Sequence, residues 1–215
     1  MNFKIKDPGS FLTHFIAMLL SITGLAPLLY RVAQHPGRGK LEVFLIFSVS
    51  FILLYGASSA YHFFDVSPRV NRVLKKLDHM MIFVMIAGSY TPVCLVALGN
   101  RTGWLMLLAV CGISLLGMLM NLLWIGCPRW VSSVIYIALG WVCAFSLTEL
   151  VRVLTTAEFI LLLSGGIIYT IGGIIYALKL PLLGGRFRYF GNHELFHVFV
   201  MAGSACHYGM MLLLA

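Results

Sequence analysis

The chain has 215 residues, of which 60% are hydrophobic and only 10% are charged. A soluble domain carries about 25% charged residues, and a water-soluble fold of this length could not bury so much apolar surface. The net charge of +8 would suggest a nucleic-acid ligand on a soluble protein. Here the basic residues lie in short loops between apolar runs, where they meet lipid head groups. We therefore expect a membrane protein without a nucleic-acid partner, with residues 1–215 forming one domain.

Seven apolar segments reach the length of about 20 residues that a helix needs to cross a bilayer. In chain order they are residues 11–30, 41–63, 77–98, 103–125, 130–150, 158–178 and 192–214. None shows the alternation of apolar and polar residues that marks a strand of a transmembrane barrel. The sequence thus predicts an all-α integral membrane protein, a seven-transmembrane helix bundle.

Polar or turn-forming residues connect these segments, and the three longest connections are residues 34–40, 65–76 and 179–191. The sixth segment contains the glycine pairs Gly165-Gly166 and Gly172-Gly173, which predict close packing between helices. The five cysteines are scattered singly without a CxxC pair. We interpret them as small apolar residues of the bundle.

The distribution of basic residues predicts the orientation in the membrane. Ten of the 15 Lys and Arg residues fall in the N-terminal tail and in the second, fourth and sixth connections. They are Lys4, Lys6, Arg69, Arg72, Lys75, Lys76, Arg129, Lys179, Arg186 and Arg188. The other side receives Arg31, Arg38, Lys40, Arg101 and Arg152. Because cytoplasmic loops carry the excess of Lys and Arg, this count predicts a cytoplasmic N-terminus.

Several ionisable residues are predicted at the cytoplasmic end of the bundle. His62 ends the second segment, Asp78 begins the third, and His193 and His197 begin the seventh. Successive spans run in opposite directions, so all four residues lie at the same depth. Ionisable residues are costly within a membrane and are therefore candidates for function.

The pattern of these residues predicts a metal site. His193 and His197 are four residues apart, so both rings project from one face of a helix. With His62 they would make a three-ligand zinc site with an open fourth position, although imidazoles also bind copper, iron or nickel. Ser58, one turn before His62, and Asp78 are the candidate catalytic residues beside the metal. The alternative is that the histidines are hydrogen-bonding contacts between helices.

The seventh segment also matches the HExxH pattern of zinc proteases, with Glu194 between His193 and His197 as the general base. Such enzymes need a third ligand, and none of the 18 residues after His197 is acidic. Glu194 has a second interpretation, as an acid at a helix start that the helix dipole favours.

Three sequence elements together resemble the hemolysin III family, the bacterial branch of the progestin and adipoQ receptor superfamily, which is related to the alkaline ceramidases. The first is Ser58-Ser59-Ala60-Tyr61-His62, and the second is Asp78-His79 followed by Ala87-Gly88-Ser89-Tyr90-Thr91-Pro92. The third is His193-Glu194-Leu195-Phe196-His197, followed by Gly203-Ser204 and His207-Tyr208.

The resemblance implies a seven-helix bundle with a cytoplasmic N-terminus in the plasma (inner) membrane. It further implies a zinc ion held by His62, His193 and His197, with Ser58 and Asp78 beside it. We expect a zinc-dependent hydrolase of a lipid amide or ester, whose acyl chain enters the bundle from the bilayer. Two alternatives stay open: a non-catalytic sensor of membrane lipid state with structural zinc, and a cytolysin.

Overall fold

The computed structural model describes residues 5–35, 41–124, 126–180, 182–183 and 189–215, and these form helices and no strand. In chain order the helices are α1 (Pro8–Gln34), α2 (Leu41–Phe63), α3 (Pro68–Pro92), α4 (Arg101–Leu123), α5 (Arg129–Gly140), α6 (Leu147–Val153), α7 (Thr156–Leu178) and α8 (Asn192–Leu214). A π-helical segment η1 (Val93–Leu98) continues α3, and a 3₁₀ segment η2 (Trp141–Ser146) joins α5 to α6. With these continuations the described residues form seven helices long and apolar enough to span a membrane, as predicted.

The largest difference from the predicted boundaries lies at the start of α3. Most of the predicted polar connection, residues 65–76, is helical, because α3 begins at Pro68 rather than at residue 77. Pro68 takes the first helical position, and the Ser67 side chain accepts a hydrogen bond from the Val70 backbone at 3.3 Å. Hydropathy missed these turns because they carry four basic residues. Residues 36–40, 125, 181 and 184–188, which belong to predicted connections or segment ends, lie outside the described residues.

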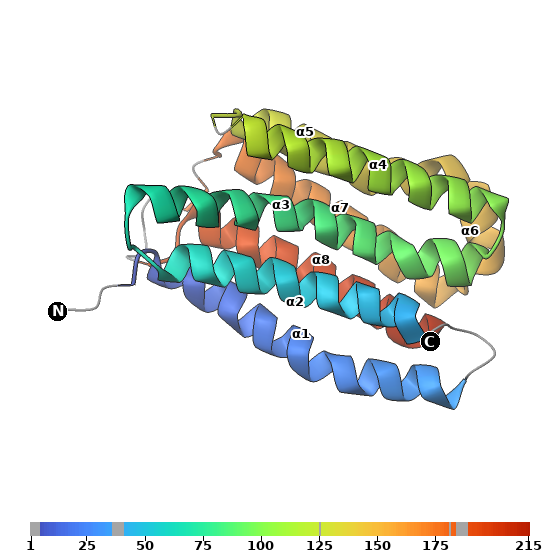
Figure 1. The fold of residues 1–215 in the computed structure, drawn as a ribbon. Helices are drawn as coiled ribbons and strands as arrows, with labels where there is room; N and C mark the ends of the chain where they lie inside the picture. The colour runs from blue at the N-terminus through green and yellow to red at the C-terminus, as the bar shows by residue number, and fades with distance from the viewer. Residues whose placement is uncertain (1–4, 36–40, 125, 181, 184–188) are drawn as a thin grey trace.

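The seven spans lie side by side with their axes roughly aligned (Figure 1). Each span contacts its neighbour in the sequence α1, α2, α3, α4, α5, α7, α8, and contacts between α8 and α1 close the ring. Consequently the starts of α1, α3, α5 and α8 and the ends of α2, α4 and α7 meet at one end of the bundle (Figure 1). This arrangement brings the predicted site residues together.

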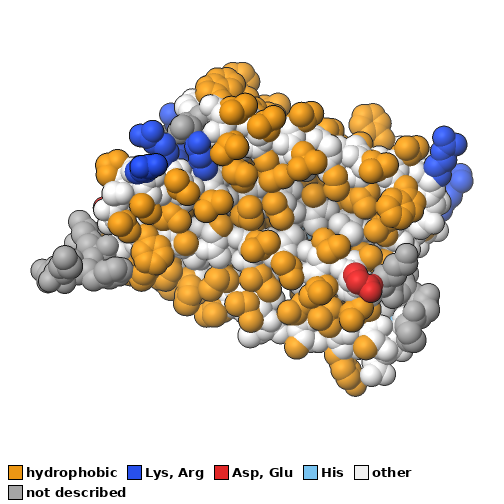
Figure 2. All heavy atoms as spheres, viewed as in Figure 1, with side chains coloured by type: hydrophobic (Ala, Val, Ile, Leu, Met, Phe, Trp, Pro, Cys, Tyr) orange, Lys and Arg blue, Asp and Glu red, His pale blue; other side chains and the backbone are white. Residues whose placement is uncertain are grey.

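Polar side chains are buried inside this bundle while large apolar ones face outward. Leu20, Leu116 and Phe145 are among many exposed apolar residues, and Phe145 is 91% exposed. Figure 2 shows apolar side chains over the middle of the surface, with Lys and Arg near its two ends. A surface of this kind is solvated by lipid tails.

Two spans depart from α-helical geometry, and Tyr90, near the end of α3, contacts the second of these departures. Pro92 lacks a backbone N–H and crowds the preceding turn, which favours the π-helical segment that follows it. In the fifth span, the 3₁₀ segment leaves backbone groups without their α-helical partners. The Tyr90 hydroxyl donates to the Gly140 carbonyl at 2.8 Å and accepts from the Cys143 N–H at 2.9 Å. Tyr90 thereby satisfies backbone groups that lipid could not.

The predicted close packing at the glycine pairs is confirmed for three of the four residues. A Cβ atom added at Gly165 would lie 2.7 Å from the His207 ring, and one at Gly172 would lie 2.7 Å from Phe199 Cβ. A Cβ at Gly173 would lie 3.0 Å from Ile137, whereas the nearest atom at Gly166 is 4.0 Å away. Gly165 and Gly172 therefore let α7 approach α8 closely.

Candidate metal centre

The structure brings the three predicted histidine ligands together. His62 lies at the end of α2, and His193 and His197 lie in the first two turns of α8. One ring nitrogen from each lies within 4.8 Å of the other two, and His62 and His197 are buried. This spacing is close enough for the three rings to bind one metal ion.

In two of the three histidine rings, hydrogen bonds determine which ring nitrogen faces the site. His62 Nδ1 lies 3.0 Å from Asp7 Oδ2, and a carboxylate only accepts, so this nitrogen carries the hydrogen. His197 Nδ1 lies 2.9 Å from the Thr13 hydroxyl, which donates its own hydrogen to the Ser10 carbonyl at 2.9 Å. Thr13 therefore accepts from His197 Nδ1. In both rings Nε2 is left with a free lone pair, as a metal ligand requires.

The distance between two of the ring nitrogens fits a tetrahedral metal. His62 Nε2 and His193 Nε2 are 3.3 Å apart, and two nitrogens bound at about 2.0–2.1 Å to one tetrahedral zinc ion are about 3.3 Å apart. Since the His62 Nε2 lone pair faces His193, the pair needs a proton on His193 or a shared cation between the rings. The chemistry and spacing of the donors fit zinc.

The segment that leads into α1 holds this site against the end of α2. The Asp7 N–H donates to the His62 carbonyl at 2.9 Å, and the Lys6 N–H donates to the Phe63 carbonyl at 3.3 Å. The Lys6 ammonium donates to the Tyr61 carbonyl at 3.2 Å and lies 3.4 Å from the centroid of the Tyr61 ring. Lys6 and Asp7 thus satisfy carbonyls that the last turn of α2 leaves unpaired. Sequence reasoning missed Asp7, although an acid just before the first span was a usable signal.

Glu194 is engaged at the start of its own helix. One carboxylate oxygen accepts from the Ser10 hydroxyl, and the other accepts from the Gly191 N–H at 2.8 Å. Ser10 is buried on α1, so this contact also ties α8 to α1. The arrangement matches the capping interpretation of Glu194, since its carboxylate binds the N–H of the residue just before α8.

The two predicted catalytic residues face the same cavity as the histidines. Ser58 is buried one turn before His62, and its hydroxyl interacts with the Asp78 carboxylate. The Nδ1 atom of His79, the next residue in the chain, lies 3.5 Å from Asp78 Oδ2. The same nitrogen lies 2.8 Å from the Lys75 carbonyl, which accepts its hydrogen. A carboxylate on this wall is the type of group that can accept a proton from a molecule in the cavity.

Two further histidines lie near the site or along the cavity. His14 stacks on His197 with ring centroids 3.5 Å apart, and within the described part of the chain neither of its buried nitrogens has a hydrogen-bond partner. It therefore supports the His197 ring by packing. His207 lies further along α8, where its ring stacks on Tyr169 at 5.4 Å. His207 belongs to the packing between α7 and α8 and not to the histidine cluster.

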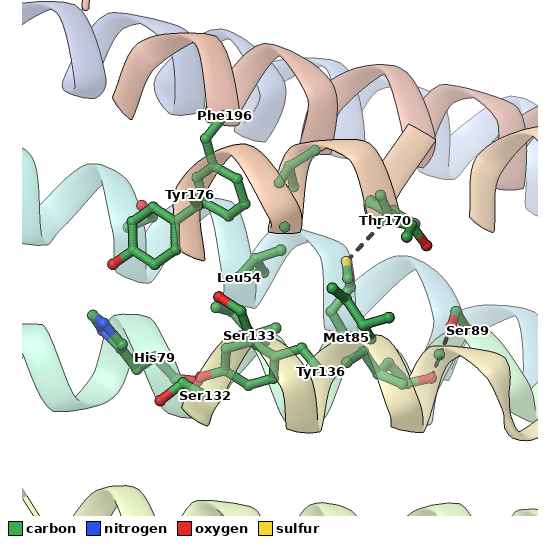
Figure 3. Close-up of a pocket in the computed structure, with 18 of the residues that line it drawn as sticks. Leu54, His79, Met85, Ser89, Ser132, Ser133, Tyr136, Thr170, Tyr176 and Phe196 are labelled. Atoms are coloured by element: carbon green, nitrogen blue, oxygen red, sulfur yellow. Dashed lines mark hydrogen bonds between the residues drawn. The ribbon is translucent and has the colours of Figure 1, made fainter. Parts of the chain in front are cut away.

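A cavity of about 560 Å³ extends from the histidines between the helices. Figure 3 shows its wall, with Tyr176 of α7 and Phe196 of α8 opposite His79 of α3 and Tyr136 of α5. Further from the histidines the cavity is lined mainly by apolar side chains, including those of Val93, Leu150, Phe159 and Leu162. A long, mainly apolar cavity that ends at polar groups can accept an acyl chain.

The model of the family described as "Haemolysin-III related" matches residues 3–208 of this chain. The chain belongs to this family. It is 32% identical over 205 residues to Hemolysin-3 of Bacillus cereus, a match that covers 95% of this chain and 89% of the relative. It is 33% identical to the Hemolysin-3 homolog of Bacillus subtilis (strain 168), over 94% of this chain and 92% of that one.

The haemolysin III family is linked to a wider group of heptahelical proteins. The adiponectin receptor protein of Drosophila melanogaster is 23% identical over 228 residues, which cover 94% of this chain and 49% of the receptor. These matches confirm the family and superfamily placement that the three sequence elements indicated. The histidine cluster and the buried Ser58 fall on those same elements.

Proposed function

We propose that this member of the haemolysin III family is a membrane-embedded, zinc-dependent hydrolase of a lipid amide or ester. The observation that carries the proposal is the position of the histidine cluster at one end of the mainly apolar cavity, together with Asp78 and Ser58. A metal with a purely structural role does not need a cavity that leads to it, whereas a catalytic metal must be accessible to its substrate. The spacing of His62 and His193 supports zinc as the metal.

His62, His193 and His197 would hold zinc, which when bound would polarise an acyl carbonyl and activate water. Asp78 would take up a proton from the attacking water and pass it to the leaving group. Ser58 would donate a hydrogen bond to the reacting oxygen or to Asp78. The apolar wall would hold the acyl chain and exclude bulk water. Asp7 and Thr13 would keep the ligand rings in the required tautomer.

We further propose that the N-terminus and the metal centre lie at the cytoplasmic face of the plasma (inner) membrane. The excess of basic residues at this end of the bundle supports this orientation. The substrate would then enter from the surrounding bilayer, with its polar part at the cytoplasmic surface and its chain in the cavity. Labelling of a single cysteine introduced near either terminus, in intact cells, measures the orientation.

The first test is elemental analysis of detergent-purified protein. We expect about one zinc per chain in the wild type, none in His193→Ala/His197→Ala, and an unchanged content in His35→Ala, whose ring is exposed at the end of α1. Zinc-loaded protein is then supplied with acyl amides and esters, and the release of fatty acid is measured. A metal-free wild type, or a zinc-loaded protein that cleaves none of these lipids, would refute the proposal.

A further inference from the structure

A second pocket opens beside the main cavity at the end of the bundle where α5 begins and α7 ends. It has a volume of about 330 Å³ and shares Lys75, Cys127 and Arg129 with the main cavity. Lys179, at the end of α7, also lines it. Three spans thus contribute one cation each, and none of the described residues that line this pocket is acidic.

These cations have no carboxylate partner in the described part of the chain, which includes all seven acidic residues. No ion pair within 4.0 Å involves Lys75, Arg129 or Lys179. The four acidic side chains at this end of the bundle interact with other residues instead. The pairs are Asp7 with His62, Asp65 with Asn71, Asp78 with Ser58, and Glu194 with Gly191. The pocket therefore keeps a net positive charge that the protein itself does not neutralise.

The location of Arg129 adds to this field. Arg129 is the first residue of α5, where the helix dipole is positive and a cation is unfavourable without a neighbouring anion. Its guanidinium carbon lies 5.2 Å from the centroid of the Tyr176 ring. The Tyr176 ring is in turn 5.8 Å from the ring of His193. An anion bound by Arg129 would lie one aromatic ring away from the candidate metal ligands.

We propose that the pocket lined by Lys75, Arg129 and Lys179 binds the phosphate of an anionic lipid whose acyl chain occupies the main cavity. A guanidinium fork and two ammonium groups suit phosphate oxygens, and basic pockets between spans bind anionic head groups. Trp130, beside Arg129, is exposed, as is usual for an aromatic residue at the level of lipid head groups.

This inference rests on the proposed function only in naming the substrate class. In a glycerophospholipid a carboxylic ester lies a few bonds from the phosphate. A phosphate at Arg129 would therefore bring that ester close to the histidine cluster. The substrate of the proposed hydrolase is then an anionic phospholipid.

The test measures lipid binding to full-length protein in a neutral detergent, without requiring turnover. The probes are phosphatidylglycerol and phosphatidylcholine with identical acyl chains, and inorganic phosphate, with dissociation constants from native mass spectrometry or tryptophan fluorescence. We expect phosphatidylglycerol to bind at least tenfold more tightly than phosphatidylcholine. Arg129→Gln should weaken its binding at least tenfold, and Lys75→Gln/Arg129→Gln more. Arg69→Gln, a control at the same end that lines neither pocket, should change it less than twofold.

Equal binding of the two lipids would overturn the inference, because the pocket then does not recognise an anionic head group. Equal losses in Arg129→Gln and Arg69→Gln would also overturn it, because basic residues then act only through the general positive field of this face. Phosphate that binds as tightly as phosphatidylglycerol would overturn the lipid assignment. The variant His193→Ala/His197→Ala separates the two proposals. If the preference for the anionic lipid persists in it while wild-type protein holds no zinc, the proposed function fails and the head-group site stands.

Discussion

The Asp7 carboxylate accepts a hydrogen bond from His62 Nδ1 at 3.0 Å, although 55 residues separate the two in the chain. The contact places the hydrogen on Nδ1 and leaves Nε2 directed toward His193. A carboxylate in this position holds a metal-binding imidazole in one tautomer and one ring orientation. The Asp7 N–H also donates to the His62 carbonyl. Both the backbone and the side chain of Asp7 are therefore fixed against His62.

Asp7→Asn is expected to weaken zinc binding by about 10–100-fold, the usual effect of removing an outer partner of a metal-bound histidine. An amide in place of the carboxylate loses the charge that supports the imidazole. The measurement is a competitive zinc titration, with helix content from circular dichroism as a check on folding. Asp65→Asn is the matched control, because Asp65 is exposed and accepts a hydrogen bond from Asn71 in the first turn of α3, away from the histidine cluster. An affinity unchanged in Asp7→Asn would show that the contact does not support the metal.

Asp78→Asn distinguishes a catalytic from a structural metal. If Asp78 moves a proton in the reaction, the variant should bind zinc as the wild type does and lose about 10²–10⁴-fold in turnover. A shape-conserving amide cannot accept the proton. The measurements are zinc content and the rate of lipid hydrolysis on the same preparation. Wild-type turnover in Asp78→Asn would show that Asp78 takes no part in the reaction. Loss of zinc from the variant would show instead that Asp78 stabilises the metal site.

Much of the site was predictable because its key residues lie at the ends of spans. His193 and His197 share a helix face by spacing alone, and the alternating direction of spans brings His62 to the same end of the bundle. The residues that hydrogen-bond to the histidine rings were not predictable in this way. Asp7, just before α1, bonds to His62 of α2, and Thr13 of α1 bonds to His197 of α8. No local pattern specifies which side chains face each other across a bundle.

The fold was predictable in its spans and less so in their details. Runs of about 20 apolar residues identify spanning helices because the bilayer sets their length. The first turns of α3 escaped this criterion since Arg69, Arg72 and Lys75 make them polar. The 3₁₀ segment of the fifth span also escaped, because its stability comes from Tyr90 on a different helix. Both differences arise where tertiary contacts or capping, rather than hydropathy, decide the conformation.

Tyr90→Phe is expected to destabilise the protein by about 1–2 kcal/mol. The change removes the hydroxyl that accepts from the Cys143 N–H and donates to the Gly140 carbonyl, and so removes both hydrogen bonds from an apolar interior. Thermal unfolding in detergent measures the effect, with Tyr30→Phe as the control because Tyr30 is 68% exposed. Equal stability of the two variants would mean that the 3₁₀ segment does not depend on Tyr90.

Gly172→Ala is expected to destabilise the bundle by about 1–3 kcal/mol, the usual cost of overpacking. The new Cβ would lie 2.7 Å from Phe199 Cβ, an atom fixed to the backbone of α8 that cannot swing away. Helix α7 would have to move outward from α8, which also displaces the first turns of α8 from the histidine cluster. We therefore expect a lower unfolding temperature together with weaker zinc binding.

Gly112→Ala supplies the comparison, because a Cβ at Gly112 on α4 meets no atom within 4 Å. Alanine is favoured over glycine inside a helix by about 0.5–1 kcal/mol, so this variant should be slightly more stable and bind zinc normally. The two identical substitutions then differ only in what surrounds the added methyl group. If Gly172→Ala were as stable as Gly112→Ala, the close approach of α7 and α8 would contribute nothing to the position of the metal ligands.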